Sequence, residues 1–449
     1  MKIVKKEFSL FVIFMSIFMS MFVLYPRYAY ANAAGKSKTP VLSGQAIKNI
    51  RLFSKVYSLV KKNYVKTENS KKLIYGAIKG MIGALDPHTY FLTRSEFKDL
   101  REETSGEFTG IGIKISVKDR HIVIISPIDG TPAAKAGIKP GDIIEKIGNV
   151  STYNMNVMKA VKLMRGKPGT SVDLLIMRKD FKKPELFVIK RAKIILKSVK
   201  YMIMPHHIGY VRISSFQTRT NGELLRALKE LNAKENGLKG LIVDLRNNPG
   251  GLLNSAVKVC SDFIKNGVIV YTKGRIKSQD VKYYASGKHL QPDYPMVVLV
   301  NAGTASAAEI TAGSLQAHKR AVVVGTKTFG KGSVQTVFNL PEGTGMGLTT
   351  AFYFLPDGVS VQDTGVIPNF IIHSSKDFIF VKSLPKLREV DLRHHFKNPE
   401  SQKLKKSDKF KAFRSFFKKD DQLRFAYELL ESWGYLKNSD MGNVKHNVE

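Results

Sequence analysis

The stretch from residue 199 to 372 alternates apolar strands with helices, and this alternation constrains the fold of the chain more than any other feature. Its strands are continuous apolar runs, as in the segments IGYVRISSF, GLIVDLR and PMVVLVN. Helical patterns over 221–231 and 252–264 separate these runs. Strands that are buried on both faces have continuous apolar runs, and parallel strands need long, usually helical, connections. The pattern therefore predicts a largely parallel α/β core over residues 196–375.

The regions on either side of this core have different patterns. Apolar residues recur three and four positions apart in IRLFSKVYSLVKKNYV and LIYGAIKGMIGAL, which predicts a helical N-terminal domain over 43–105. Short alternating strands, glycine and proline turns and one helix over 154–164 predict a separate β-rich domain over 106–195. A basic linker and a C-terminal helix are expected over 376–449. The whole chain is thus predicted to be a multidomain α+β protein.

The first 31 residues have the layout of a secretory signal. Lysines come first, an uncharged run follows from residue 8 to 24, and small residues then allow cleavage after Ala31 or Ala33. The run is at the short limit for crossing a bilayer of about 30 Å, so an uncleaved N-terminal anchor is the alternative. We expect an exported protein of the periplasm or cell envelope, either free or anchored by this segment.

Composition limits the classes of partner and of covalent chemistry. The formal net charge is +35, which favours contact with an anionic membrane or cell-wall surface, although general solubility is the simpler explanation. Nucleic acid is not expected, because the lysines are spread along the whole length of an exported chain. The single cysteine, Cys260, lies in the apolar segment AVKVCSDFI and is expected to be a small core residue.

A candidate nucleophile, Ser306, follows the apolar strand PMVVLVN and opens a helix in NAGTASAAEI. A serine at a helix N-terminus lies where backbone N–H groups and the helix dipole stabilise a developing oxyanion. Glu309 follows at the spacing of a capping box, so this feature alone also fits an ordinary helix start.

The base for such a serine is not an evident histidine. None of the ten histidines lies near a glycine-rich strand end, and Thr304 and Ala308 replace the glycines of a GxSxG elbow. Lys331 is the better candidate, because glycines flank it in GTKTFGKGSVQ and Ser-Lys pairs are a known means of activating serine. Burial would have to lower its pKa from about 10.4 toward neutrality. A solvated loop lysine is the alternative.

Gln335 follows Lys331 by four residues, and an extended strand would separate the two by roughly 13 Å. The segment must therefore turn if they cooperate, and the amide oxygen of Gln335 could then accept a hydrogen bond from the lysine amine. In DLRNNPGG, the N–H of Gly250 or Gly251 could form a two-donor oxyanion hole with that of Ala307, although an ordinary strand-to-helix turn explains these glycines equally well.

The β-rich region contains the segment FTGIGIKI, in which Gly110 and Gly112 interrupt an apolar strand. Consecutive backbone N–H groups in such a loop can bind the terminal carboxylate of a peptide, while the peptide adds as a strand beside it. The segment TPAAKAGIKPGDIIEKIGN follows as a short helix, a turn and a strand.

Five segments in this order, FTGIGIKI, PAAKAGIKPGDIIEKIG, DLRNNPGG, NAGTASAAEI and GTKTFGKGSVQ, closely resemble the carboxyl-terminal processing, or tail-specific, proteases. The likeness extends from about residue 43 to 370 and includes ALDPHTYF. It implies a PDZ domain and a crotonase-like catalytic core. It also implies a catalytic Ser306, a general base Lys331 and a supporting Gln335, with no metal and no organic cofactor.

The resemblance further implies a peptide-binding loop and a link from it to the site. The loop residues are Thr109, Gly110, Ile111, Gly112 and Ile113, and Arg165 is implied to connect the PDZ domain to the active site. Protein substrates with apolar C-terminal tails are the implied partners. An inert PDZ scaffold and a polyanion-binding envelope protein are the alternative functions, and an adaptor protein and a homo-oligomer stay open.

Overall fold

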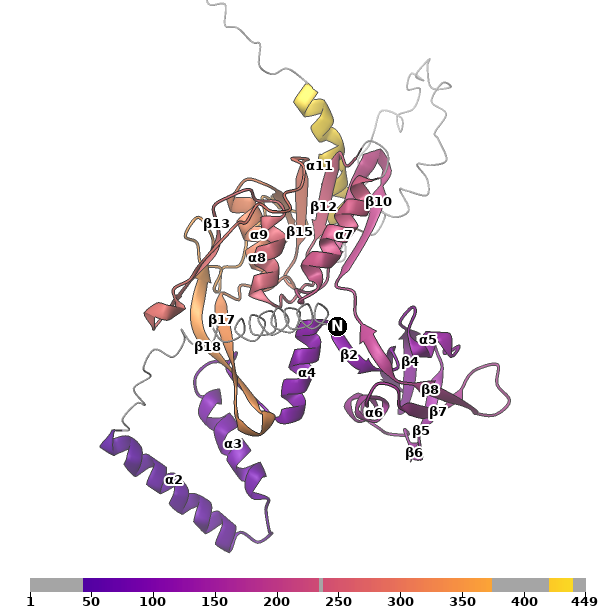
Figure 1. Ribbon diagram of the computed structural model, residues 1–449, viewed down its shortest axis with the longest axis vertical. Helices are drawn as coiled ribbons and strands as arrows, with labels where there is room; N and C mark the ends of the chain where they lie inside the picture. Colours follow the sequence, from indigo (N-terminus) through magenta and orange to yellow (C-terminus); the bar gives the residue numbers. More distant parts are fainter. Residues whose placement is uncertain (1–42, 234–236, 374–419, 439–449) are drawn as a thin grey trace, which may run out of the picture. The chain divides into compact units, whose positions relative to one another are not determined.

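The computed structural model describes residues 43–233, 237–373 and 420–438 (Figure 1). The expected secretory signal and the basic linker lie outside the described residues. The described residues form two compact units, divided between Met81 and Ile82.

In the first unit, α2 (Gly44–Asn63) begins after Ser43, whose side chain accepts a hydrogen bond from the N–H of Ala46 at 3.2 Å. None of the α2 residues is buried. A second helix, α3 (Ser70–Gly83), spans the boundary between the units. Both helices lie where the apolar spacing predicts helical structure.

The second unit is built around a six-stranded sheet in the order β10-β11-β12-β15-β16-β19. Every pairing from β11 to β19 is parallel, and β10 alone is antiparallel to its neighbour. The predicted largely parallel sheet is therefore confirmed. Its strands are β10 (Val199–Met204), β11 (Ile208–Ile213), β12 (Gly240–Asp244), β15 (Met296–Val300), β16 (Val322–Gly325) and β19 (Phe370–Ile371).

Helices cover both faces of this sheet. On one face lie α7 (Thr220–Asn232), α8 (Leu253–Ser261) and α9 (Ala307–Ala317), and on the other lies α11 (Asp421–Asn438) (Figure 1). Successive residues of β12 point to opposite faces, so that Leu241 and Val243 pack with the first group while Ile242 packs with α11. The continuous apolar runs follow from this burial on both sides.

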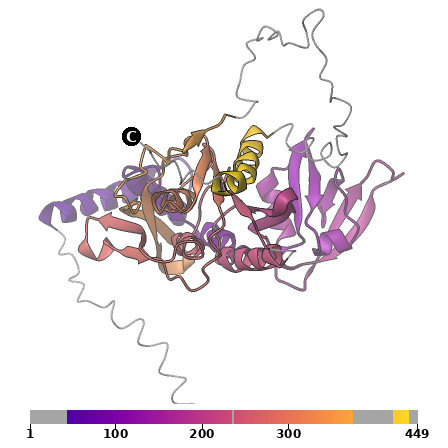
Figure 2. The same ribbon diagram turned by 90° about the horizontal axis from the view of Figure 1, so that it is seen from above.

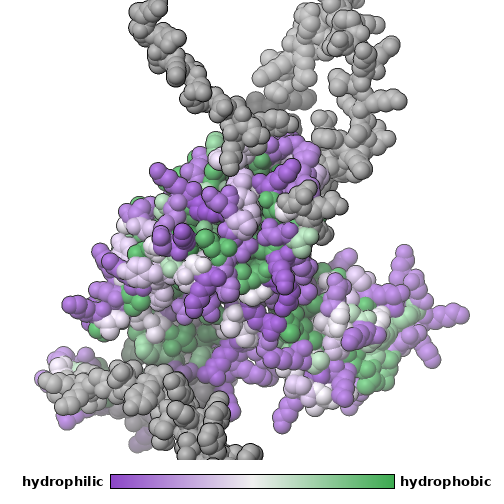
Figure 3. All heavy atoms as spheres, turned by 45° about the horizontal axis from the view of Figure 1, so that its top comes forward, coloured by the Kyte–Doolittle hydropathy of each residue, from purple (hydrophilic) through white to green (hydrophobic). Residues whose placement is uncertain are grey.

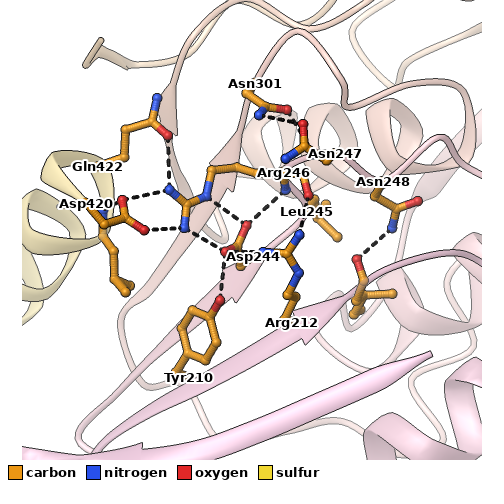
Figure 4. Close-up of polar contacts among 12 residues, drawn as sticks. Tyr210, Arg212, Asp244, Leu245, Arg246, Asn247, Asn248, Asn301, Asp420 and Gln422 are labelled. Atoms are coloured by element: carbon orange, nitrogen blue, oxygen red, sulfur yellow. Dashed lines mark hydrogen bonds and ion pairs between the residues drawn. The ribbon is translucent and has the colours of Figure 1, made fainter. Parts of the chain in front are cut away.

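The start of α11 is fastened to the end of β12 by Arg246 (Figure 4). Its guanidinium donates to Asp244 at 2.8 and 3.0 Å and to Asp420 at 2.7 and 2.8 Å. Gln422 accepts from it at 3.2 Å, and the hydroxyl of Tyr210 donates to Asp244 at 2.7 Å. Because the side chain of Asp244 is fully buried, these hydrogen bonds replace the water that its carboxylate has lost.

A second sheet joins β1 to the hairpin of β17 and β18. It contains β1 (Tyr90–Leu92), β18 (Gly345–Phe354), β13 (Val268–Gly274) and β14 (Lys282–Tyr284) in that order, with β17 (Ser333–Asn339) also paired to β18. Helix α4 (Arg94–Ser105) follows β1 and begins with a capping box, in which Thr93 and Glu96 bind each other's backbone N–H.

The β-rich region has its own sheet and its own core, and its strands are drawn in violet to magenta in Figure 2. The order is β3-β4-β5-β7-β8, with β6 beside β5. These strands are β3 (Ile113–Lys118), β4 (His121–Pro127), β5 (Ile143–Ile147), β6 (Val150–Ser151), β7 (Ser171–Met177) and β8 (Glu185–Lys190). A short helix, α5 (Pro132–Lys135), follows β4. A two-stranded pair, β2 (Glu107–Gly110) and β9 (Ala192–Ile195), flanks the region.

The helix predicted over 154–164 in this region is shorter than expected. The observed helix α6 (Val157–Met164) begins later, because Asn154 has a left-handed φ of 58° and cannot extend it. Asn156 instead caps the helix, accepting from the N–H of Lys159 at 2.8 Å.

The described surface is mainly hydrophilic, and the single cysteine lies in the interior. Hydrophilic side chains predominate on the described face in Figure 3, and in the described ranges no helix is long and apolar enough to cross a membrane. Cys260 is fully buried in the main core, as expected, and burial raises the pKa of its thiol to about 12. A thiol of this kind stays protonated and unreactive at neutral pH.

The Arg246 cluster gives a test of how α11 is held. Burial alone would raise the pKa of Asp420, but the hydrogen bonds and charge of Arg246 outweigh it and lower that pKa. We expect Asp420→Asn to reduce the free energy of unfolding at neutral pH by about 1.5–3 kcal/mol, the usual contribution of a hydrogen bond to a charged group.

Because the folded-state pKa is lowered, this stabilisation is present above the ordinary value of 3.8 and is lost as the pH falls through the folded-state pKa. The difference between wild type and variant should therefore shrink in acid. Denaturant unfolding at several pH values measures it, with Glu428→Gln, an exposed change on the same helix, as the control. Equal stability of Asp420→Asn and wild type at neutral pH would contradict the role given to this contact.

Candidate active site

Ser306 lies at the sharp junction between β15 and α9, with φ of 54° and ψ of −118°. A residue with a side chain rarely adopts positive φ, and such conformations cost about 1–3 kcal/mol. The strain positions the serine where the carboxyl ends of the adjacent parallel strands β12 and β15 meet. Sites of α/β proteins lie at this edge of the sheet.

A buried carboxylate, that of Glu309, connects the segments of Ser306 and Lys331. One oxygen, Oε2, accepts from the N–H of Ser306 at 2.8 Å and from the N–H of Lys331 at 3.0 Å. The other oxygen accepts from the N–H of Gly330 at 2.7 Å and from the hydroxyl of Thr328 at 2.6 Å. Glu309 is fully buried, so these four donors replace its hydration.

Tyr353 makes a second connection between the same segments. Its hydroxyl contacts the carbonyl oxygen of Lys331 at 2.6 Å and that of Ser306 at 3.3 Å. The side chain is almost fully buried, and burial raises the pKa of its hydroxyl well above the ordinary value. It therefore remains a proton donor at neutral pH. The structure thus brings together the backbones of the two residues that the sequence singled out.

The side chain of Lys331 is partly withdrawn from water. Burial lowers the pKa of its amine, and the nearby carboxylate of Asp86 opposes this effect without cancelling it. Among the described residues, no hydrogen bond joins Nζ of Lys331 to Oγ of Ser306, and the Ser306 side chain takes part in the capping box with Glu309.

Gln335 lies on β17, immediately after a bulge at Val334 and Gln335 that interrupts the pairing with β18. Its amide nitrogen donates to Oγ of Ser333 at 3.0 Å and to Oγ1 of Thr349 at 3.3 Å. The bulge interrupts the regular pairing of the strand just before Gln335. A hydrogen bond between Gln335 and the amine of Lys331 is not formed in the described part of the chain.

Gly250 packs directly against the serine loop. A Cβ atom at Gly250 would lie 2.9 Å from Cβ of Ser306 and 3.0 Å from the N atom of Ala307, and its φ is +99°. Its N–H already donates to Oδ1 of Asn248 at 2.9 Å.

Gly251 has a different environment. It forms a parallel bridge with Phe216. The N–H of Phe216 donates to the carbonyl of Gly250 at 2.8 Å, and the N–H of Leu252 donates to the carbonyl of Phe216 at 2.7 Å. In such a bridge the N–H of the central residue points away from the partner strand. The structure therefore distinguishes the two glycines that the sequence left equivalent: the N–H of Gly250 is engaged and that of Gly251 is not part of the bridge.

The loop of Thr109 to Ile113 belongs to the β-rich region and connects β2 with β3. Gly112 has φ of +82°, and a Cβ there would lie 2.4 Å from Cβ of Thr131, so only glycine fits. The carbonyls of Ile111 and Gly112 accept from Ala133 and Ile128 at 3.0 and 2.9 Å. Strand β3 is an edge strand of its sheet, and α6 packs beside it.

Arg165 ends α6 and contacts α4 rather than the serine. Its guanidinium pairs with Asp99 and, at 3.1 Å, with Glu102. It also lies over the ring of Phe108, 5.8 Å from its centroid. Arg165 thus joins the β-rich region to α4, and the expected link from the PDZ domain to the active site stays a prediction.

Sequence reasoning missed three contributors to this site. Glu309 was noted only as a helix cap, although a carboxylate within the apolar run of α9 is itself a signal of a buried polar function. Asp86 lies in the segment ALDPHTYF, but the sequence does not assign it a function in the site. No motif or spacing in the sequence points to Tyr353. In the residues that the structure describes, no group of histidine, cysteine and carboxylate side chains could hold a metal ion.

The contacts of Glu309 can be tested directly. Glu309→Gln keeps the shape and one acceptor oxygen but turns an amide NH2 toward backbone N–H groups. We expect the free energy of unfolding to fall by about 1–3 kcal/mol for each donor left unpaired. Denaturant unfolding checks this, with Glu185→Gln, an exposed change on β8, as the control. A variant as stable as the control would show that the carboxylate does not hold the two segments.

Family descriptions and known proteins match this arrangement. Three descriptions match: peptidase family S41 over residues 207–372, the PDZ domain over 99–177, and the N-terminal domain of the activating protease CtpB over 14–95. A carboxy-terminal-processing protease of Bartonella bacilliformis is 40% identical over 389 residues, which cover 85% of this chain and 88% of that protein.

More distant relatives carry similar names. A probable CtpA-like serine protease of Staphylococcus haemolyticus is 39% identical over 332 residues, covering 74% of this chain and 65% of that protein. Among solved structures, the photosystem II D1 C-terminal processing protease is 31% identical and aligns with a TM-score of 0.43, covering 72% of this chain and 86% of that one. The chain therefore belongs to peptidase family S41, as a serine-type carboxyl-terminal processing protease that carries a PDZ domain.

Proposed function

We propose that this protease cleaves exported proteins near their C-termini, with Ser306 as nucleophile, Lys331 as general base and Gln335 as its supporting residue. The observation that carries the proposal is the shared carboxylate oxygen of Glu309, which accepts from the backbone N–H of both Ser306 and Lys331. The partial burial of Lys331 lowers the pKa of its amine, which favours the neutral form that a base requires.

The reaction is acyl transfer in two steps. Neutral Lys331 takes the proton of the Ser306 hydroxyl while Oγ attacks the scissile carbonyl carbon, and the lysine then gives that proton to the leaving amine as the C–N bond breaks. Water next attacks the acyl-enzyme, with Lys331 again as base, which releases the new C-terminus and restores the serine.

The oxyanion is proposed to bind the N–H groups of Ala307 and Gly251. Gly251 is preferred to Gly250 because the N–H of Gly250 is already engaged by Asn248. The loss of one such donor reduces the rate by roughly 10²- to 10³-fold. Gly250 instead allows the serine loop to pack closely, because a Cβ atom at this position would lie 2.9 Å from Cβ of Ser306.

The PDZ domain is proposed to bind the apolar tail of the substrate along the free edge of β3, with the carboxylate at the loop of Thr109 to Ile113. The crotonase-like description of the core and export through the N-terminal segment belong to the same proposal. Export is supported by the layout of residues 1–31. Adaptor binding, an anionic surface and a homo-oligomer stay predictions.

The nucleophile can be tested by mapping products. Ser306→Ala removes the only atom that forms the acyl bond, so we expect cleavage to fall at least 10³-fold while binding of an apolar C-terminal peptide is retained. Mass spectrometry of new C-termini, after incubation with candidate exported proteins, measures this. Ser278→Ala, an exposed change, is the control and should cut normally. Undiminished cleavage by Ser306→Ala would assign the nucleophile elsewhere.

The base can be tested by pH. Because the amine acts only when neutral, kcat/KM should rise with pH through the pKa of Lys331, which lies below the ordinary value of 10.5. Lys331→Arg keeps the charge but stays protonated at every working pH, so we expect it to be inactive. Lys277→Arg is the exposed control. An active Lys331→Arg variant with an unchanged pH profile would exclude the lysine as base.

A further inference from the structure

Asp86 lies in the turn between α3 and β1, and its carboxylate is the end of a chain of hydrogen bonds. It accepts from the N–H of His88 at 2.8 Å and from the N–H and hydroxyl of Thr89 at 2.9 and 2.7 Å. It also accepts from Oγ1 of Thr349, on β18, at 3.1 Å. The first three contacts shape the turn, whereas the fourth leads toward the site.

The direction of this chain is set by the carboxylate. An ionised carboxylate only accepts hydrogen bonds, so the single hydroxyl proton of Thr349 must point to Asp86. The oxygen of Thr349 is then free to accept, and it does so from the amide nitrogen of Gln335 at 3.3 Å. Because that nitrogen also donates to Ser333, both of its protons are used and the amide oxygen faces the other way.

We propose that Asp86 is a positioning residue, which acts through Thr349 to present the amide oxygen of Gln335 to Lys331. Its carboxylate also supplies a negative charge near the amine of Lys331 once that amine has taken the proton of Ser306. This inference rests on the proposed function, since it gives Gln335 and Lys331 the roles proposed above. A reversed amide would present NH2 to the amine, and two donors cannot hydrogen-bond.

Electrostatics favour the same arrangement. Hydrogen bonds from Thr89, His88 and Thr349 outweigh burial and lower the pKa of Asp86, so its carboxylate is ionised at neutral pH. The other titratable groups around the lysine segment are Glu309, Tyr353 and Asp363, which contact its backbone or that of Gly330. Among the groups that shift the pKa of Lys331, Asp86 is the charge that raises it.

The reaction explains why such a charge is useful. When the proton moves from Ser306 to Lys331, a neutral pair becomes an ammonium ion and a tetrahedral oxyanion in a partly desolvated site. The carboxylate stabilises the ammonium ion and keeps the amine from becoming too weak a base. Burial and Asp86 therefore act in opposite directions on one group and set its basicity between them.

The hydrogen-bond chain is tested by Thr349→Val, which keeps the β-branched shape and the charge of Asp86 but removes the hydroxyl. We expect kcat to fall by about tenfold, the equivalent of one hydrogen bond to the catalytic machinery, with KM unchanged. Thr349→Ser should restore the rate. Thr350→Val is the matched control, because the hydroxyl of Thr350 contacts that of Thr336 at 2.7 Å on the exposed side of the strand. Equal kcat values for Thr349→Val and Thr350→Val would overturn the positioning role.

The charge is tested by Asp86→Asn, which keeps an acceptor oxygen for the turn. We expect the pKa of Lys331, followed by NMR of the lysine side-chain carbons, to fall by about one unit. The titration is done in the Ser306→Ala background, with the Lys331 signal assigned by its loss in Lys331→Met, so it does not depend on proteolysis. An unchanged pKa would overturn the electrostatic part.

The two proposals fail in distinguishable ways. If Ser306→Ala cleaves as well as wild type, the proposed function is wrong, and the catalytic role of Asp86 falls with it. If Ser306→Ala is inactive while the Thr349 and Asp86 variants behave like wild type in rate and titration, the dyad stands and only the inference about Asp86 is wrong.

Discussion

The architecture of the site depends on one buried carboxylate, that of Glu309. A carboxylate without water is strongly destabilised unless hydrogen bonds replace its hydration, and here four donors do so. Because three of them are backbone N–H groups, the carboxylate and the course of the two loops determine each other. Ser306 and Lys331 are thereby held in place through their main-chain N–H groups.

The surrounding fold supplies a rigid support for these loops. The strands β12 and β15 are adjacent and parallel, so the glycine loop and the serine loop leave the sheet side by side. Direct contacts join them: the N–H of Ala305 donates to the carbonyl of Asn248 at 2.9 Å, and Asn247 and Asn301 pair through their side chains (Figure 4). A displacement of either strand would therefore move both halves of the site.

Much of this could be predicted from the sequence, because its signals are local. Continuous apolar runs indicated a sheet buried on both faces, and small residues around Ser306 and glycines around Lys331 indicated the loops that the structure brings together. The remaining contacts join distant positions: Thr349 and Asp86 are 263 residues apart, and Arg246 and Asp420 are 174 apart. No periodicity reports such pairs. The late start of α6 was missed because it depends on the left-handed backbone of Asn154.

Helix α11 supports the sheet although it is far from the other described elements in the sequence. Its residues Leu423, Ala426, Tyr427 and Leu430 pack against one face of the six-stranded sheet. The same helix is held at its start by Arg246, close to the loop of Gly250. A truncation that removes this helix would therefore expose the apolar face of the sheet that it covers and release the end of β12 from its partner Asp420.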